Sequence, residues 1–403
     1  MQNVFNTLER RGYVEQLTHP EEIKKLFEKE CVPFYIGIDP TADSLHVGHF
    51  ISLMVASHMQ KAGHKPIILM GGGTAIIGDP SGKTDMRKML TVEDIDNNVA
   101  QIKKQIEKFL SFEGPNAAII VNNGDWLRDL NYINFMREIG VHFSVNRMLA
   151  AECYKNRLET GLTFFELGYM LMQSYDFLYL HDHYGCKLEM GGNDQWSNII
   201  GGVELIRKIG AEDAYGFTFK LLTTKEGKKM GKTEKGALWL NPEKTSPYEF
   251  YQYWRNVADD DIENVMKLLT FIDVDEIEEM TKYKVERFNE AKRRAAFEIT
   301  KLVHGEEAAI KAEEATKAMF EGKGNVEAME STKVEVGCTI TEALVNAGIA
   351  PSKGQAKTLI SQGALSLNDE KIDDTAYVLK EEDFKEGYAI LRKGKKIYHK
   401  LTK

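Results

Sequence analysis

The chain has few cysteines. It carries four among 403 residues, at Cys31, Cys153, Cys186 and Cys338, and no two of them form a Cys-x-x-Cys pair. This spacing argues against a disulfide framework and against a zinc knuckle. We therefore expect a protein that works in the reducing cytoplasm.

The sequence also lacks a long hydrophobic run. Its longest uncharged apolar stretch, Pro66–Gly78, is much shorter than the roughly 20 residues that span a bilayer. The first residues, "MQNVFNTLERRGYV", contain no apolar stretch of the kind found in signal peptides. We expect neither export nor a membrane partner.

Positive charge is scarce overall. The formal net charge is −9, so a nucleic-acid site would have to be local. The segment from Gly387 to Lys403 contains six basic residues and no acidic ones. Such a cluster is typical either of phosphate binding or of a solvated tail.

The apolar pattern predicts an α/β protein with further units. Short runs such as "FYIGI" and "PIILMGG" alternate with helical patterns, which favours a Rossmann-like parallel sheet in residues 1–240. Charged amphipathic helices follow in 241–320. A polar, glycine-containing stretch, 321–336, is expected to be a linker, and 337–403 a small α+β domain.

The segment "FYIGIDPTADSLHVGHF" predicts a strand, a loop and a helix that begins at His46. His46 and His49 share one helical face, and Gly48 between them has no side chain to block a flat ring. A phosphate would suit this helix start. A helix start without a ligand stays an alternative. No nearby cysteine or carboxylate completes a metal site with the histidines, so none is predicted.

Two further patterns carry possible chemistry. In "KKMGKTEKG", Lys229 and Lys232 could close on a polyphosphate, or could belong to a solvated loop. In "YMLMQSYD", Tyr169, Gln173 and Asp176 are spaced i, i+4, i+7 and share one helical face. A polar stripe in an apolar segment has either internal partners or a ligand.

Taken together, "HVGH" and "KMGKT" resemble the two signatures of class I aminoacyl-tRNA synthetases. The ordered motifs "YIGIDPTADSLHVGH", "GDPSGK", "GYMLMQSYDF", "GGNDQW", "TSPYEFYQYW" and "KLVHGEE" resemble bacterial-type tyrosyl-tRNA synthetases over nearly the whole chain. This resemblance implies a catalytic domain, an α-helical anticodon-side domain, and an RNA-binding domain of the ribosomal-protein-S-four type around "PSKGQAKTLISQGALSLN".

The resemblance implies a two-step reaction. Tyrosine and ATP would form tyrosyl-adenylate and pyrophosphate, and tyrosine would then pass to the 3′ end of tRNA(Tyr). The first step needs no general base, because the attacking carboxylate is already ionised at neutral pH. Mg²⁺ is expected to accompany the ATP.

The implied site residues fall into three groups. For tyrosine they are Tyr35 and Asp176 at the hydroxyl, Tyr169, Gln173 and Asp79 at the ammonium, and Gln195 near the carboxylate. For ATP they are Gly37, Asp39, His46, Gly48, His49, Gly192, Asp194 and Lys232. For stabilising transition-state charge they are Thr41, His46, His49, Lys83, Arg87, Lys229, Lys232 and Thr233.

The match has one departure. "KMGKT" carries Gly231 and Thr233 where the general signature has two serines, so the hydroxyl at the first position is absent. The resemblance also implies a homodimer, and the apolar segment "INFMREIGVHFSVNRML" could be its interface or part of the core.

Two rival functions have to be weighed. A tryptophanyl-tRNA synthetase would share the fold and the chemistry, but the RNA-binding tail and the pairing of Tyr35 with Asp176 disfavour it. An RNA-binding or splicing protein on a catalytically inactive synthetase scaffold is the other. The intact signatures favour the enzyme.

Overall fold

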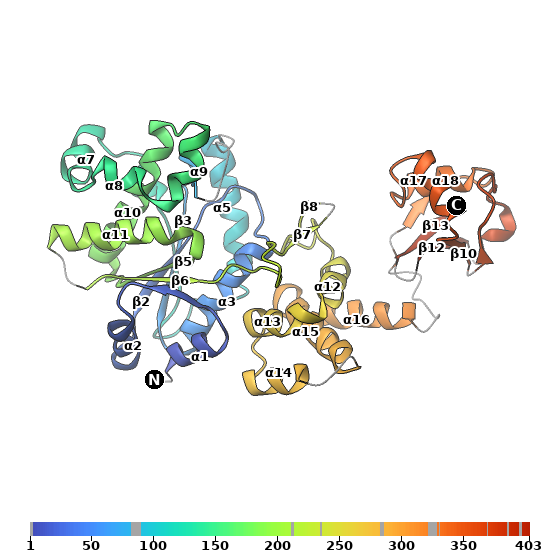
Figure 1. The fold of residues 1–403 in the computed structure, drawn as a ribbon, viewed down its shortest axis with the longest axis horizontal. Helices are drawn as coiled ribbons and strands as arrows, with labels where there is room; N and C mark the ends of the chain where they lie inside the picture. The colour runs from blue at the N-terminus through green and yellow to red at the C-terminus, as the bar shows by residue number, and fades with distance from the viewer. Residues whose placement is uncertain are drawn as a thin grey trace. The chain divides into compact units, whose positions relative to one another are not determined.

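The computed structural model describes most of the chain. The described residues are 3–81, 90–210, 213–233, 236–282, 286–320, 329, 331–368, 370–384, 387–394 and 397–403, with the backbone alone for 232, 233, 286, 287, 318–320 and 397. The chain forms two compact units, Met1–Glu313 and Glu314–Lys403, shown in Figure 1. Each is described by itself.

A six-stranded sheet forms the centre of the first unit. Its strands are β1 (Val14–Leu17), β2 (Pro33–Ile38), β3 (Lys65–Met70), β4 (Ile119–Asn122), β5 (Leu188–Gly192) and β6 (Tyr215–Phe219). The strand order is β1-β6-β5-β2-β3-β4. Only β1 runs antiparallel to its neighbour, and the other pairs are parallel. The order reverses between β2 and β5, where the C-terminal ends of the strands leave room for a ligand.

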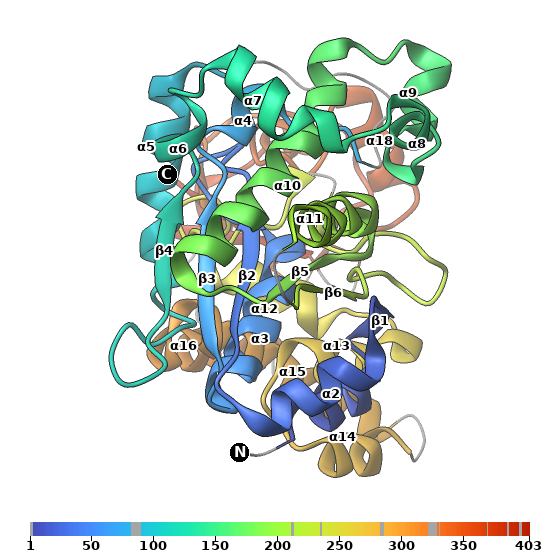
Figure 2. The ribbon, with the colours of Figure 1, turned by 90° about the vertical axis from the view of Figure 1, so that its left-hand side faces the viewer.

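Helices accompany this sheet. They are α1 (Val4–Arg10), α2 (Pro20–Lys29), α3 (Val47–Lys61), α4 (Thr74–Ile77), α5 (Val92–Ile106), α6 (Gly124–Leu127), α7 (Tyr132–Glu138), α8 (Val145–Leu149), α9 (Glu152–Thr160), α10 (Phe164–Tyr184) and α11 (Trp196–Ile209). Short 3₁₀ turns lie at η1 (Gly140–His142) and η2 (Asn193–Gln195). Helix α3 packs on β2 and β3, while α11 packs on β5, β6 and α10 (Figure 2).

Alternation along the strands explains the two buried faces. Ile36 and Ile68 belong to the apolar cluster that contains α3. Tyr35 and Ile67, one residue earlier, belong to the cluster that contains Phe177 of α10 and part of the buried face of α11. Successive side chains of a strand point to opposite faces, so strands buried on both sides read as continuous apolar runs. The polar hydroxyl of Tyr35 thereby comes to lie beneath α10.

A helical region completes the first unit. It contains α12 (Pro247–Arg255), η3 (Asp259–Asp261), α13 (Ile262–Leu269), α14 (Val274–Thr281) and α15 (Glu286–His304), and a short hairpin of β7 (Lys232–Thr233) and β8 (Gly236–Ala237) precedes it. Ser246 caps α12 and Pro247 occupies its first turn, a sequence-encoded helix start. Trp254 is fully buried in the same apolar cluster as β2 and α3.

The second unit has its own sheet and core. Its strands are β9 (Ser331–Lys333), β10 (Leu365–Leu367), β11 (Glu370–Lys371), β12 (Tyr388–Lys393) and β13 (Ile397–Thr402), and α16 (Glu306–Phe320) leads into this unit. Two helices, α17 (Ile340–Asn346) and α18 (Lys353–Ser361), and the turn η5 (Glu381–Asp383) complete it. Buried Leu344, Ile360 and Leu391 form part of a separate apolar cluster.

The predicted fold class is confirmed: a Rossmann-like parallel sheet, a helical region and a C-terminal domain with a small sheet. The predicted boundaries at 240, 320 and 336 stay predictions. Among the described helices, none combines the length and the apolar character that crossing a bilayer requires.

Candidate active site

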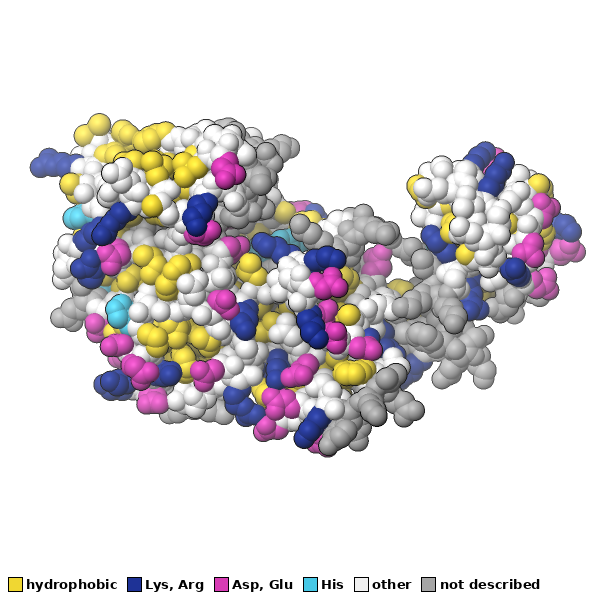
Figure 3. All heavy atoms as spheres, in the orientation of Figure 1, with side chains coloured by type: hydrophobic (Ala, Val, Ile, Leu, Met, Phe, Trp, Pro, Cys, Tyr) yellow, Lys and Arg dark blue, Asp and Glu magenta, His cyan; other side chains and the backbone are white. Residues whose placement is uncertain are grey.

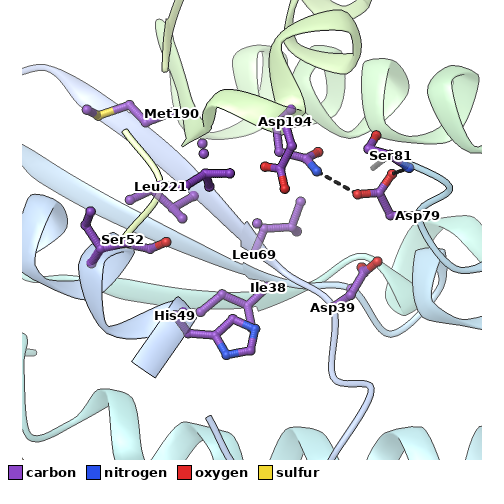
Figure 4. Close-up of a pocket in the computed structure, with 18 of the residues that line it drawn as sticks. Ile38, Asp39, His49, Ser52, Leu69, Asp79, Ser81, Met190, Asp194 and Leu221 are labelled. Carbon is purple, nitrogen blue, oxygen red and sulfur yellow. Dashed lines mark hydrogen bonds between the residues drawn. The ribbon is translucent and has the colours of Figure 1, made fainter. Parts of the chain in front are cut away.

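A pocket opens at the C-terminal ends of β2 and β5, where the strand order reverses. Its volume is about 530 Å³, which suits a small-molecule ligand. In Figure 4, Asp39, Asp79 and Asp194 reach into this cavity from three separate segments, and His49 enters from α3.

All predicted site residues that are fully described line this one pocket. They are Tyr35, Gly37, Asp39, Thr41, His46, Gly48, His49, Asp79, Tyr169, Gln173, Asp176, Gly192, Asp194, Gln195 and Lys229. Lys83 and Arg87 lie outside the described residues. Lys232 and Thr233 form β7, and of these two only the backbone is described.

The first helix at the pocket begins as predicted. His46 is the N-cap of α3 and its Nδ1 accepts a hydrogen bond from the backbone N–H of Gly48 at 3.0 Å. The ring of His49 lies 4.1 Å from the ring of His46, centroid to centroid. A side chain at Gly48 would put its Cβ 2.7 Å from the His46 ring, so any other residue here would displace that ring. The histidines therefore cap the helix and also face the pocket.

The loop that contains Lys229 to Gly231 contacts the same helix. Gly231 has a φ of +80°, a conformation that side chains disfavour, and its N–H donates to the Tyr253 hydroxyl at 2.8 Å. A Cβ at Gly231 would lie 2.9 Å from the Cβ of Val47. The departure from serine at this position thus fits the loop conformation seen here. Lys229 Nζ lies 3.8 Å from Asp194 Oδ2.

The deepest part of the pocket holds Asp176, which is 1% exposed. Its two oxygens accept hydrogen bonds from Asn123 Nδ2 and Trp126 Nε1, each at 2.8 Å. Burial raises the pKa of Asp176 well above its ordinary value, and these two hydrogen bonds lower it in part. The carboxyl is therefore fixed in position before any ligand arrives.

A second network joins Asp39 to α10. Asp39 accepts hydrogen bonds from the hydroxyls of Thr74, at 2.8 Å, and Tyr169, at 2.9 Å. Asn123 Nδ2 also donates to Thr74 Oγ1 at 3.0 Å, which links this network to Asp176. Burial, followed by the charge of Asp39, raises the pKa of Tyr169, so this phenol stays protonated and keeps donating.

Asp79 is held at the side of the pocket. It accepts hydrogen bonds from the backbone N–H of Ser81 at 2.9 Å and from Gln195 Nε2 at 2.6 Å, both drawn in Figure 4. Gln195 Oε1 in turn accepts from Asn198 of α11 at 3.2 Å. The predicted ammonium and carboxylate positions are thus joined by a direct hydrogen bond.

Glu189 of β5 is the least expected member of the site. It is 1% exposed, and its strand register sets it beside Tyr35 of β2. Glu189 Oε1 accepts a hydrogen bond from Gln173 Nε2 at 2.9 Å. Within the described residues, the Tyr35 hydroxyl, Glu189 Oε2 and Gln173 Oε1 are buried without a hydrogen-bond partner. Burial raises the pKa of Glu189 to about 7.

Four residues that contact predicted ones were not predicted from the sequence: Thr74, Asn123, Trp126 and Glu189. One signal was available for Asn123. "NNGDW" directly follows the short apolar run "AAIIV", and polar residues after parallel strands gather at one edge of a sheet. Glu189 had no such signal, because its partners come from a neighbouring strand and from α10.

Comparisons with known proteins agree with this geometry. The family model described as "tRNA synthetases class I (W and Y)" matches residues 28–321, and the model described as "Tyrosine--tRNA ligase SYY-like C-terminal domain" matches residues 321–401. Among solved structures, a C-terminally truncated mitochondrial tyrosyl-tRNA synthetase from Aspergillus nidulans is similar, with a TM-score of 0.71 and 28% identity. That likeness covers 79% of this chain and 95% of the other.

The fold alone does not distinguish synthetases for tyrosine from those for tryptophan. A tryptophanyl-tRNA synthetase from Encephalitozoon cuniculi shares it, with a TM-score of 0.56 and 13% identity, over 76% of this chain and 87% of the other. Sequence does separate them. A protein named tyrosine–tRNA ligase from Clostridium perfringens is 60% identical, with 100% of both chains covered. One of the same name from Caldanaerobacter subterraneus subsp. tengcongensis is 59% identical, with 99% of both chains covered.

The chain belongs to the class I tRNA synthetases and, within that class, to the tyrosine–tRNA ligase family.

Glu189→Gln should stabilise the ligand-free protein more as pH rises. A folded-state pKa near 7, against an ordinary value of about 4.3, means that stability is lost as pH rises from about 4.3 to 7. Glutamine removes this loss, which is worth roughly 4 kcal/mol at most above pH 7. Urea unfolding at several pH values measures the difference. Glu226→Gln, at an exposed carboxylate, is the control and should give a flat difference. A flat difference for Glu189→Gln as well would contradict the expectation.

Proposed function

We propose that this pocket performs the tyrosine activation of its family, and that the predicted residues carry the roles their positions suggest. The function of the chain is that of a tyrosine–tRNA ligase, an enzyme of the class I tRNA synthetases. The observation that carries the residue assignment is the buried polar floor. Asp176 and Tyr35 are each 1% exposed, and Tyr35 belongs to an apolar cluster with Ile67 and Leu69, so a tyrosine ring with a polar tip fits this part of the pocket.

Tyrosine would lie between β2 and α10 with its hydroxyl at Asp176 and Tyr35. Its ammonium would meet Tyr169, Gln173 and Asp79, which line the same pocket. Gln195, which donates to Asp79 at 2.6 Å, would lie beside the carboxylate. The assignment is supported by the position of all three groups in the lining of one pocket.

ATP would bind where α3 begins. Its phosphates would lie near the first turn of α3, whose backbone donors favour negative charge. The residues proposed for ATP are Gly37, Asp39, His46, Gly48, His49, Gly192, Asp194 and Lys232. Asp194, at the start of η2 after β5, would accept from the ribose, and Gly192 would let that ribose approach the backbone.

The first chemical step is an in-line displacement. A carboxylate oxygen of tyrosine forms a bond to the α-phosphorus of ATP while the bond from that phosphorus to the bridging oxygen breaks, and pyrophosphate leaves. Charge grows on the phosphate oxygens, and preorganised donors and cations stabilise it. We assign this role to Thr41, His46, His49, Lys83, Arg87, Lys229, Lys232 and Thr233.

ATP would enter as its Mg²⁺ complex. Of the described residues that line the pocket, only Lys229 is a lysine or arginine. Five lining residues carry carboxyls: Asp39, Asp79, Asp176, Glu189 and Asp194. A metal that arrives with the nucleotide would offset part of this negative charge.

The second step transfers tyrosine to tRNA(Tyr). A ribose hydroxyl at the tRNA 3′ end attacks the carbonyl carbon of the adenylate, and AMP leaves. We propose that the second unit binds this RNA. Arg392, Lys393 and Lys400 lie on the strands β12 and β13, and Lys353 and Lys357 lie on α18.

Two further properties complete the proposal. We place the enzyme in the cytoplasm, where tRNA and ATP are found, and its four cysteines are unpaired, as a reducing compartment requires. We also propose a homodimer. Exposed apolar side chains gather on α7, η1, α8 and the start of α10, and Figure 3 shows apolar surface where Figure 1 labels α7 and α8.

Rejection of phenylalanine tests the hydroxyl site. Phenylalanine has no hydroxyl to pair with Asp176 and Tyr35. Each buried group left without that partner would cost about 1 to 3 kcal/mol of binding free energy. Tyr35→Phe should lower the tyrosine-to-phenylalanine ratio of kcat/KM in pyrophosphate exchange by roughly tenfold. Asp176→Asn should lower tyrosine activation on the order of 10²-fold, because an amide oxygen cannot accept from Asn123 and Trp126 and also serve the substrate. Unchanged ratios in both variants would remove these residues from the hydroxyl site.

Removal of the second sheet and core tests the RNA-binding proposal. A chain that ends at Phe320, before β9, should keep tyrosine-dependent pyrophosphate exchange within about threefold, because the pocket lies wholly in the first unit. Its charging of tRNA should fall about 100-fold and lose most of its dependence on salt. Equal charging by both chains would show that the second unit does not bind tRNA.

The oligomeric state tests the apolar surface. Ile133 and Val141 are 69% and 71% exposed, so Ile133→Asp with Val141→Asp should convert a dimer into a monomer. Light scattering after size exclusion measures the mass against 45.7 kDa per chain. Val92→Asp on α5, 46% exposed, is the matched control and should leave the dimer intact. A wild-type monomer would overturn the proposal.

A further inference from the structure

The two ends of the Gln173 side-chain amide differ in their hydrogen bonding. Its Nε2 donates to Glu189 Oε1 at 2.9 Å. Its Oε1 is buried and accepts no hydrogen bond within the described residues, although Gln173 lines the pocket. The two ends of an amide differ chemically, since one only donates and the other only accepts. Which end faces the ligand therefore decides what the ligand must carry.

Glu189 decides the orientation of this amide. An ionised carboxylate can accept hydrogen bonds but cannot donate them, so it turns the Gln173 NH₂ toward itself and the oxygen away. The carboxylate is itself fixed: β5 aligns it beside Tyr35 of β2, and Gly202 of α11 leaves room for its Oε2. A Cβ at Gly202 would lie 3.0 Å from that oxygen.

We propose that Glu189 is a positioning residue, which holds the Gln173 amide so that its oxygen accepts from the ammonium of the tyrosine substrate. The inference rests on the proposed function, in which Gln173 serves the ammonium. It adds a residue that never has to touch the substrate. Without the carboxylate, the amide can present its NH₂ to the ammonium, and two donors then face each other.

The arrangement makes ammonium binding depend on pH. Burial raises the pKa of the Glu189 carboxyl to about 7. Once protonated, this carboxyl can donate to the Gln173 oxygen, so it no longer holds the amide in one orientation. The titratable groups that face Glu189 are Tyr35 from β2, Asp176 from α10, and Cys186 just before β5. On β6, the residue that pairs with Glu189 is Gly216, which has no titratable side chain. Burial raises the pKa of Tyr35 and Cys186, so both stay neutral near pH 7. Asp176 is the other carboxyl, and it faces the hydroxyl end.

Two tyrosine analogues separate the ammonium from the hydroxyl. Tyramine keeps the ammonium and lacks the carboxylate, while 3-(4-hydroxyphenyl)propanoate lacks the ammonium, and both keep the phenol at Asp176. Their inhibition constants are measured against tyrosine in pyrophosphate exchange, from pH 6 to 8. Glu189→Gln should weaken tyramine about 5- to 10-fold at pH 8 and the propanoate less than twofold. It should raise KM for tyrosine with little change in kcat, because the ammonium is held equally before and during reaction.

The pH profile and a double-mutant cycle complete the test. In the wild type, tyramine should bind more weakly below pH 7, and Glu189→Gln should flatten this dependence. In a Gln173→Met background, which keeps the volume and removes the amide, Glu189→Gln should have almost no further effect on tyramine. Urea unfolding establishes that each variant is folded.

Three results would overturn the inference. Equal weakening of both analogues by Glu189→Gln would indicate a general structural effect. A full Glu189→Gln effect in the Gln173→Met background would mean that the carboxylate acts on the ammonium directly. If Gln173→Met itself weakens both analogues equally, the assignment of Gln173 in the proposed function fails, and the inference fails with it. The first two results leave the proposed function intact.

Discussion

Five carboxyls share one pocket, and among the described residues that line it Lys229 is the only lysine or arginine. This imbalance of charge is the constraint on which the site depends. Acids that lose water need donors to remain in place, and the chain supplies them: Asn123 and Trp126 for buried Asp176, the Ser81 backbone with Gln195 for buried Asp79, and Thr74 and Tyr169 for the partly buried Asp39. Glu189 accepts a hydrogen bond from Gln173. A ligand that carries a cation and a hydroxyl offsets negative charge in the pocket and supplies hydrogen-bond partners that the protein itself does not provide.

The fold makes this arrangement possible. Parallel strands bring loops that are distant in sequence to one edge, and the reversal of strand order between β2 and β5 opens that edge to a ligand. Helix α10 then covers the crevice and contributes Tyr169, Gln173 and Asp176 from a single face. Because α10 is rigid and capped at Thr163, these three groups keep their spacing. The desolvated acids lower the stability of the ligand-free protein, as is common where a site is built for function.

Local patterns predicted much of this structure. The strand before Asp39, the helix start at His46 and the stripe on α10 follow from periodicities of two and 3.6, and the fold class and family were confirmed. Tertiary contacts were beyond reach. Asn123 and Trp126 reach Asp176 across about 50 residues of sequence, and Glu189 meets Gln173 only because β5 lies beneath α10. No periodicity encodes such partners. The roles of the residues in the reaction remain proposals that activity measurements decide.

The central claim is that the buried acids of the ligand-free pocket are completed by tyrosine itself. Thermal unfolding of the wild-type protein with tyrosine, phenylalanine or neither tests it most directly. At a fixed concentration, a ligand that binds only the folded state raises the Tm more when it binds more tightly. At equal millimolar concentrations, tyrosine should raise the Tm by several degrees and phenylalanine should leave it unchanged. Equal stabilisation by both amino acids would contradict the account, because it would mean that the polar floor of the pocket does not recognise the hydroxyl.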